Sequence, residues 1–258
     1  MSISFNEFFY QILMDYQDTF RITELVIPDY HIVENLAEKY LSLRPDVLES
    51  SSVSIEQINQ YNGFTIPPKT LDGVFTVLIN KNVIVENMNS HRMDWVGTIV
   101  HETTHVQDFV EYARIVGAEG YDEILKISNH GMFNLWTEVH ARANGYYFVR
   151  KYSLGVDDIR SPQLISDIVD RELPLQWKWF CEKCRAEMDE YQKAYLAAQY
   201  IGRLYTLQTL YPNVFTDEWI RCHFEGHERL SKWFAFHKAH STLQSACTNF
   251  DEMRKIFE

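Results

Sequence analysis

Apolar residues at helical spacing dominate the second half of the chain, and this pattern restricts the fold more than any other feature of the sequence. From Met93 almost to the C-terminus, apolar side chains recur every three or four residues, which is the spacing of one buried helix face. The strongest run predicts one long helix over residues 175–207. Because 46% of the 258 residues are hydrophobic, such helices can bury a real core, and intrinsic disorder is excluded.

The best strand signal lies just before Met93. Two β-branched runs, residues 74–79 and 83–85, flank Asn80-Lys81-Asn82, which predicts a hairpin. Residues 22–27 form a further short β-like run, and residues 32–43 have a helical pattern. We therefore expect an α+β, mostly α fold, with a small sheet or hairpin packed against the helix that follows it and a helical C-terminal part.

The helix expected after Met93 carries the pattern H-E-x-x-H at His101-Glu102-Thr103-Thr104-His105. Two His residues at i and i+4 are about 40° apart around a helix and about 6 Å apart along it, so both imidazoles can reach one tetrahedral zinc. Glu102 lies beside them, where its carboxylate can take a proton from a water whose pKa the metal lowers. An apolar stripe is expected to bury this helix, and Gly117 to end it; the alternative is a surface helix with two unrelated His residues.

A catalytic zinc needs a third protein ligand, and two carboxylates compete for that position. Glu111 has the metzincin spacing after His105, but metzincins turn the chain at a Gly where this sequence has Asp108. In a continuing helix Glu111 would lie about 9 Å further along the axis, rotated about 240° away. Glu138 is the stronger candidate, because a carboxylate among apolar neighbours needs a charge partner. A metal ion would be one partner, and an ion pair with Arg142 at i+4 is the alternative.

These motifs resemble a known family. Residues 74–145, with the strand signal, the HETTH helix and a downstream helix bearing Glu138, look like the gluzincin branch of the zincin metallopeptidases. The resemblance implies a zincin-like fold in which His101, His105 and Glu138 bind zinc and Glu102 is the general base and proton shuttle. It also implies that the edge strand pairs with an extended peptide substrate. Thr104-His105-Val106-Gln107 is similar to the HExTHxxQ form of phage- and mobile-element-associated peptidases, with the Gln one place earlier here.

The sequence departs from this family in one respect and leaves one role open. Many gluzincins have an Asp four residues after the third ligand, which accepts a hydrogen bond from a zinc-bound His; here that residue is Arg142. Asn144 or a backbone carbonyl is then expected to orient the His ring. The family's oxyanion-stabilising residue has four candidates in this chain, namely Tyr146, Tyr147, His223 and His227.

Two other groups of residues have metal-like spacing. His223 and His227 are at i and i+4, with His237 and His240 downstream, but Glu225 between them projects about 200° from His223. We expect a polar helix face there, with a second metal site as the alternative. Cys181 and Cys184 have zinc-knuckle spacing inside a strong helical pattern, which favours two thiols on a helix face over structural zinc.

Composition bears on the partners of the chain and on the compartment in which it is expected. A net charge of −12 argues against a nucleic-acid partner, and no apolar stretch approaches the length of a membrane span. The first twenty residues lack the basic start of a secretory signal peptide, and four cysteines are too few for a disulfide scaffold, so reduced thiols in a cytoplasm are expected.

Together these patterns predict a cytoplasmic zinc metallopeptidase that acts on a peptide or protein substrate and holds one Zn²⁺ per chain. The alternative is a non-catalytic metal-binding structural or regulatory protein on the same fold. We expect one domain over residues 1–258, with an N-terminal segment (1–72), a catalytic core (73–152) and a helical C-terminal subdomain (153–258). Nothing in the sequence specifies an oligomeric state.

Overall fold

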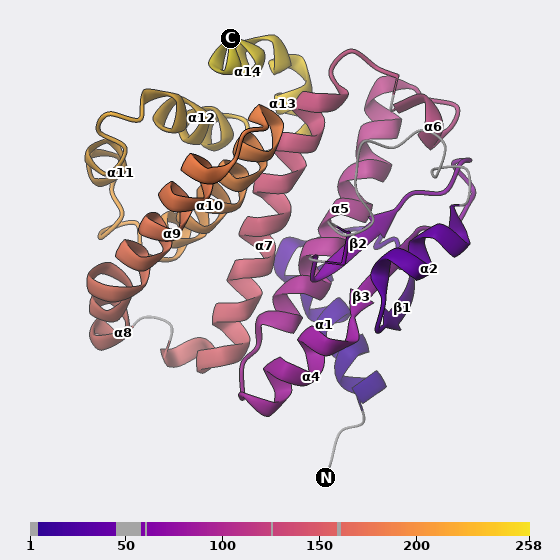
Figure 1. Ribbon diagram of the computed structural model, residues 1–258, viewed down its shortest axis with the longest axis horizontal. Coiled ribbons are helices and arrows are strands. Elements are labelled where there is room, and N and C mark those ends of the chain that lie inside the picture. The colour runs from indigo at the N-terminus through magenta and orange to yellow at the C-terminus, as the bar shows by residue number, and fades with distance from the viewer. Residues whose placement is uncertain (1–4, 45–57, 60, 125, 159–160) are drawn as a thin grey trace.

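Helices make up most of the protein, with a small three-stranded sheet at one side of them (Figure 1). Helix accounts for 71% and strand for 7%, which confirms the expected α+β, mostly α class. The structure is a computed structural model that describes residues 5–44, 58–59, 61–124, 126–158 and 161–258. Its strands are β1 Asp29–Val33, β2 Gly63–Ile66 and β3 Thr76–Asn80. Its helices are α1 Phe5–Phe20, α2 Leu36–Leu43, α4 Lys81–Asn89, α5 Asp94–Val116, α6 Tyr121–Ile124, α7 His130–Asp158, α8 Pro162–Asp167, the π-helix η2 Ile168–Glu172, α9 Leu173–Ala186, α10 Glu190–Leu210, α11 Asp217–His223, α12 Glu228–Ala239, α13 Leu243–Thr248 and α14 Phe250–Phe257.

The central strand of the sheet is β3, which pairs in parallel with β1 and antiparallel with β2. Val77 and Ile79 belong to the main core with α5, whereas Leu78 belongs to a smaller core with α2, as expected for a strand buried on both faces. The edge strand β2 alternates in the same way: Phe64 and Ile66 pack in the smaller core. Its other residues therefore face α5.

The expected hairpin over residues 74–85 is wrong in its second half. Residues 76–80 are a strand, but residues 83–85 belong to helix α4. The turn residue Asn80 is the N-cap of this helix, because its side chain accepts a hydrogen bond from the backbone N–H of Asn82 at 3.0 Å. The antiparallel partner of β3 is instead the upstream strand β2.

Three other boundaries differ from the sequence expectations. Residues 22–27 are not a strand, and the strand follows them as β1. The helix expected over 32–43 begins only at Leu36, behind an Asn35 cap. The helix expected over 175–207 is two helices, α9 and α10, separated at Glu187, whose backbone is extended, and restarted by an Asp189 cap that accepts from the N–H of Gln192.

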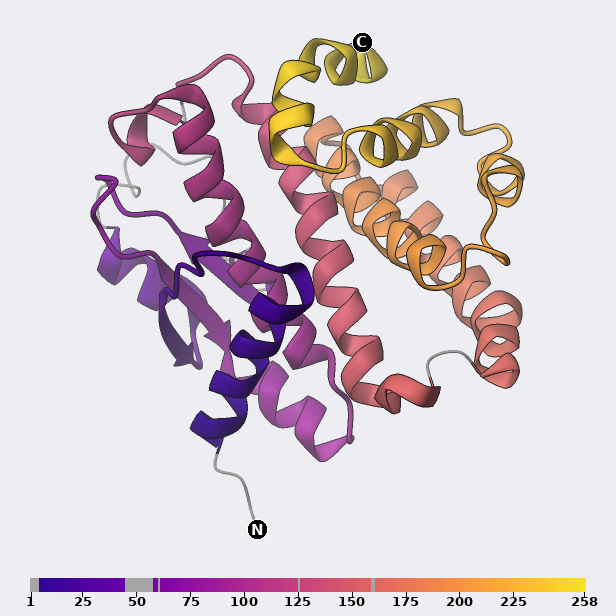
Figure 2. The ribbon, with the colours of Figure 1, turned by 180° about the vertical axis from the view of Figure 1, so that it is seen from behind.

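The long helices α5, α7 and α10 form the centre of the molecule, with the sheet beyond α5 and α9 beyond α10 (Figure 1). Seen from behind, α1 lies across α5 (Figure 2). Helices α5 and α7 touch through their backbones at Gly97 and Gly145: a Cβ at Gly145 would lie 2.6 Å from the Gly97 oxygen and 3.3 Å from the Cβ of His101. Any larger side chain there would push apart the two helices that hold the H-E-x-x-H motif and Glu138.

Helix α5 ends as expected at Gly117, which adopts the left-handed conformation (φ 65°). None of the helices in the described part of the chain has both the length and the apolar composition needed to cross a membrane.

Candidate metal centre

Two helices bring the predicted ligands His101, His105 and Glu138 together at one point. Both His side chains come from α5, and Glu138 comes from α7. The two Nε2 atoms are 3.1 Å apart, and each lies 3.4 Å from one carboxylate oxygen of Glu138. The three side chains are 9%, 13% and 7% exposed. Within the residues that the structure describes, this is the one group of three His, Cys, Asp or Glu side chains arranged to hold a metal ion.

The spacing of these atoms fits a tetrahedral metal. Zn–N and Zn–O bonds of about 2.0–2.1 Å give a tetrahedron whose edges are about 3.3–3.4 Å. The observed separations of 3.1, 3.4 and 3.4 Å lie close to that edge length. In addition, Oε1 of Glu138 is buried without a hydrogen-bond donor, which is costly for a carboxylate unless a cation lies beside it. The donor set therefore fits zinc and leaves one tetrahedral position for a small molecule.

Glu102 lies beside the three predicted ligands and against the edge strand β2. Thr65 of β2 donates a hydrogen bond to Oε2 of Glu102 at 2.8 Å. A Cβ at Gly63 would lie 2.8 Å from Cγ and 2.9 Å from Oε1 of Glu102, so only glycine lets the strand approach this closely. Burial raises the pKa of Glu102 to about 7, against the opposing effects of His105 and Thr65. A carboxylate with such a pKa can accept a proton near neutral pH.

A hydrogen-bond relay fixes the His105 ring from behind. Its Nδ1 lies 3.0 Å from the hydroxyl of Thr137, and that hydroxyl donates to Asp108 at 2.5 Å. Asp108 also lies 3.0 Å from Nδ1 of His140. A hydroxyl that donates to a carboxylate accepts from Nδ1–H, so Nε2 of His105 keeps its lone pair toward Glu138.

This relay replaces the acceptor that the sequence did not reveal. Asn144, one of the proposed acceptors, is further along: its amide lies 3.1 Å from Nε2 of His140. The backbone of Ala141 lies near the His101 ring and acts on its pKa, in keeping with the alternative of a backbone carbonyl. Nδ1 of His101 is nevertheless buried without a hydrogen-bond partner. Thr137 and Asp108 were missed because their contact joins two helices.

The two threonines inside the motif anchor α5 to its neighbours. Thr103 donates to the backbone of Ile99 and contacts the hydroxyl of Tyr30 on β1 at 2.6 Å. Thr104 contacts the hydroxyl of Tyr16 on α1 at 3.1 Å. Both threonines are fully buried, so these bonds hold the helix in register with the sheet and with α1.

The charges around the cluster favour a bound cation. Burial holds the pKa of His101 well below its usual range, and the positive charges of His105 and Arg142 act in the same direction. Burial also opposes a charged His105, but Glu138, Glu102 and Asp108 outweigh it and raise its pKa. The carboxylates thus stabilise a positive charge beside them, which can be a proton on His105 or a cation in its place, whereas His101 stays neutral.

The structure separates the two carboxylates that compete for the position of the third ligand. Helix α5 continues through Asp108, and Glu111 is exposed on it, outside the cluster. Glu138 faces the two His rings, and in the described part of the chain no ion pair joins it to Arg142.

The four residues proposed for oxyanion stabilisation lie elsewhere. Tyr146 bonds to Glu172, Tyr147 packs on Phe20, His223 bonds to Tyr200 and His227 lies against Trp177.

A tyrosine outside these four candidates, Tyr195 on α10, does approach the cluster. Its pKa is raised well above the usual value by burial, and the charges of Glu138 and Glu102 add to the effect. Tyr195 lies inside the apolar run over residues 175–207, and nothing in that run distinguishes it from the other residues of the helix face.

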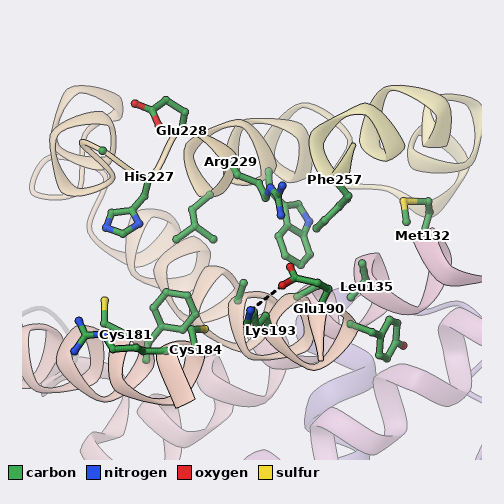
Figure 3. Close-up of a pocket in the computed structure, with 18 residues that line it drawn as sticks. Met132, Leu135, Cys181, Cys184, Glu190, Lys193, His227, Glu228, Arg229 and Phe257 are labelled. Atoms are coloured by element: carbon green, nitrogen blue, oxygen red, sulfur yellow. Dashed lines mark hydrogen bonds and ion pairs between the residues drawn. The ribbon is translucent and has the colours of Figure 1, made fainter. Parts of the chain in front are cut away.

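A cavity of about 880 Å³ lies between α7, α9, α10, α12 and α14 (Figure 3). Cys181 and Cys184 of α9 line it, with His227 opposite, and all four cysteines are free thiols. Neither these cysteines nor the His223 group forms a metal-like cluster among the described residues. On α7 the lining residue nearest to Glu138 in sequence is Leu135, one turn before it, but none of the three predicted ligands lines the cavity.

Comparisons with protein-family models, with curated proteins and with solved structures give no match to this chain.

Proposed function

We propose that this chain is a zinc-dependent peptidase in which His101, His105 and Glu138 hold the metal and Glu102 is the general base. The observation that carries the proposal is the tetrahedral spacing of the three ligand atoms with a buried carboxylate of raised pKa next to them. Zinc held there would supply a water of lowered pKa and would polarise a substrate carbonyl.

The residues around the cluster have definable tasks in this reaction. Glu102 accepts the proton of the attacking water and passes it to the leaving amine, while Thr65 holds its carboxylate in place. The Thr137–Asp108 relay keeps His105 in the tautomer that faces the metal. Tyr195 stays protonated at neutral pH, so its hydroxyl is the donor we assign to the developing oxyanion.

A peptide is the substrate that best suits the edge strand. In the described part of the chain, β2 has β3 on one side and no strand on the other. Its unpaired backbone groups next to Glu102 suit an extended peptide, as the zincin resemblance implies. The free cysteines favour a cytoplasmic setting.

The test compares Glu102→Gln with the wild type in zinc content and in hydrolysis of a peptide library. The substitution keeps the size of the side chain but cannot accept a proton, so zinc and fold should be retained while the rate falls by about 10²–10⁴-fold. Equal rates in the two zinc-loaded proteins would refute the assigned base. If the wild type binds zinc but cleaves no peptide, the alternative of a non-catalytic metal-binding protein replaces this proposal.

A further inference from the structure

A polar cavity of about 460 Å³ lies between α4, α5, α7, η2, α9 and α10, and neither the three predicted ligands nor Glu102 lines it. Thr98 and Arg142 line it, the first four residues before Glu102 on α5 and the second four residues after Glu138 on α7. Residues four apart share a helix face. The cavity is therefore next to both the general base and the third ligand, one helical turn away.

Two arginines that face this cavity have no acidic partner within hydrogen-bond distance. Arg142 of α7 and Arg203 of α10 both line it. Neither guanidinium makes a hydrogen bond or an ion pair within the described residues, and Nε of Arg142 is buried without a partner. This is unusual in a chain of net charge −12, where acidic partners are plentiful.

Four of the other five charged residues of the cavity are paired with one another, and the fifth, Glu86 of α4, is exposed. Arg150 binds Glu172, which also accepts a hydrogen bond from Tyr146 at 2.6 Å. Arg92 at the edge of the cavity binds Asp94 at 2.8 Å. Asp94 and Glu172 are therefore occupied, and four arginines against three acids leave the cavity with a net positive charge.

The two unpaired arginines also act on each other. Burial, and then the neighbouring charge of Arg142, lower the pKa of Arg203 to about 10. Two like charges withdrawn from water destabilise a fold unless an anion lies between them. Because guanidinium groups bind carboxylates through paired hydrogen bonds, a carboxylate is a ligand of fitting shape and charge.

We infer that Arg142 and Arg203 bind the C-terminal carboxylate of the peptide substrate, so that the chain is a carboxypeptidase that removes one or two residues. This inference rests on the proposed peptidase function. Arg142 is about 6 Å along α7 from Glu138, and a residue of extended chain spans about 3.3–3.6 Å. A carboxylate in this cavity thus belongs to the first or second residue beyond the scissile bond.

The experiment uses two peptide mixtures that are randomised at every position and differ only in a free or an amidated C-terminus. Mass spectrometry of the products gives the cleavage position and the ratio of the two rates. We expect the zinc-loaded wild type to cleave the free acids at least about 10-fold faster, within two residues of the C-terminus, since hydrogen bonds between a guanidinium and a carboxylate are stronger than those to a neutral amide. Equal rates on the two mixtures, or internal cleavage, would overturn the inference and leave the proposed peptidase intact.

Variants assign the effect to the arginines. Arg203→Gln should reduce the ratio of the two rates toward one, and Arg203→Lys should restore part of it, because a lysine keeps the charge but loses the paired hydrogen bonds. Arg142→Gln should act in the same direction; if its melting curve shows that it does not fold, Arg203→Gln alone decides. The matched control is Arg221→Gln, which removes an exposed arginine of α11 and should leave the ratio unchanged.

A binding measurement separates failure of this inference from failure of the proposed function. Immobilised, zinc-loaded Glu102→Gln protein is exposed to both peptide mixtures, and the retained peptides are counted. Preferential retention of the free acids, lost when Arg203→Gln is added, supports the carboxylate site even if the wild type hydrolyses nothing. Equal retention of acids and amides overturns it.

Discussion

The Thr137 hydroxyl gives the sharpest test of how the metal cluster is organised. It lies 3.0 Å from Nδ1 of His105 and donates to Asp108 at 2.5 Å, so it transmits the effect of the carboxylate to the ring. Thr137→Val has nearly the same shape but neither donates nor accepts a hydrogen bond. The ring then loses its acceptor, and the tautomer that presents Nε2 to the metal is no longer favoured.

The size of the effect follows from these two hydrogen bonds. Loss of a group that orients a metal-bound His lowers metal affinity by about 10–100-fold, which is about 1.4–2.8 kcal/mol of binding free energy. Fold stability should also fall by about 1–3 kcal/mol, because Nδ1 of His105 becomes a buried donor without a partner. Competition with a chromogenic zinc chelator measures the first quantity, and urea unfolding of the metal-free protein measures the second.

Thr206→Val is the matched control. Thr206 is as buried as Thr137, at 3% against 2% exposure, and donates to the backbone of Ala143 at 2.7 Å, away from the three ligands. It should lose comparable stability and keep its zinc affinity. The reasoning is refuted if Thr137→Val binds zinc as tightly as the wild type, or if Thr206→Val loses as much affinity.

Three further predictions concern the ligands and the base. Glu138→Ala should lose zinc, measured by elemental analysis, whereas Glu111→Ala should retain it; the reverse would move the third ligand to α5. Gly63→Ala places a Cβ 2.8 Å from Cγ of Glu102, so stability should fall by about 1–3 kcal/mol and hydrolysis should slow, while Gly131→Ala, which has open space around it, should do neither. In metal-free protein Glu102 keeps its proton up to about pH 7, whereas the unfolded chain loses it near 4.5, so the unfolding free energy of the wild type relative to Glu102→Gln should fall as pH rises between these values. A difference that is constant with pH would contradict the buried position of this carboxylate.

Much of the cluster of His101, His105 and Glu138 could be predicted because its information is local. His101, Glu102 and His105 lie within five residues of one helix, and helical geometry alone places both rings on one side. Glu138 could be proposed because burial of a carboxylate requires a partner, whichever helix supplies it. Tyr195 could not, since its approach to Glu138 depends on how α10 crosses α7.

The fold errors have a common physical origin. Residues 83–85 have high strand propensity, but the Asn80 side chain begins a helix there, and such a cap outweighs the preferences of three residues. In residues 175–207 the apolar period continues across Glu187 to Asp189, so periodicity shows no break. The break consists of the extended backbone at Glu187 and the Asp189 cap. An Asp inside a continuous apolar period does not by itself indicate a helix boundary, so the sequence pattern does not reveal this cap.

Helix α7 explains why so few residues of the cluster can be varied independently. Over two successive turns it supplies the hydroxyl of Thr137, the carboxylate of Glu138 and the arginine that faces the polar cavity, Arg142. All three depend on one crossing with α5, where Gly97 and Gly145 touch. A methyl group added at either glycine would push α7 away from α5. The ligand distances, the relay to His105 and the proposed carboxylate site would then change together, because a close-packed helix shifts as a unit.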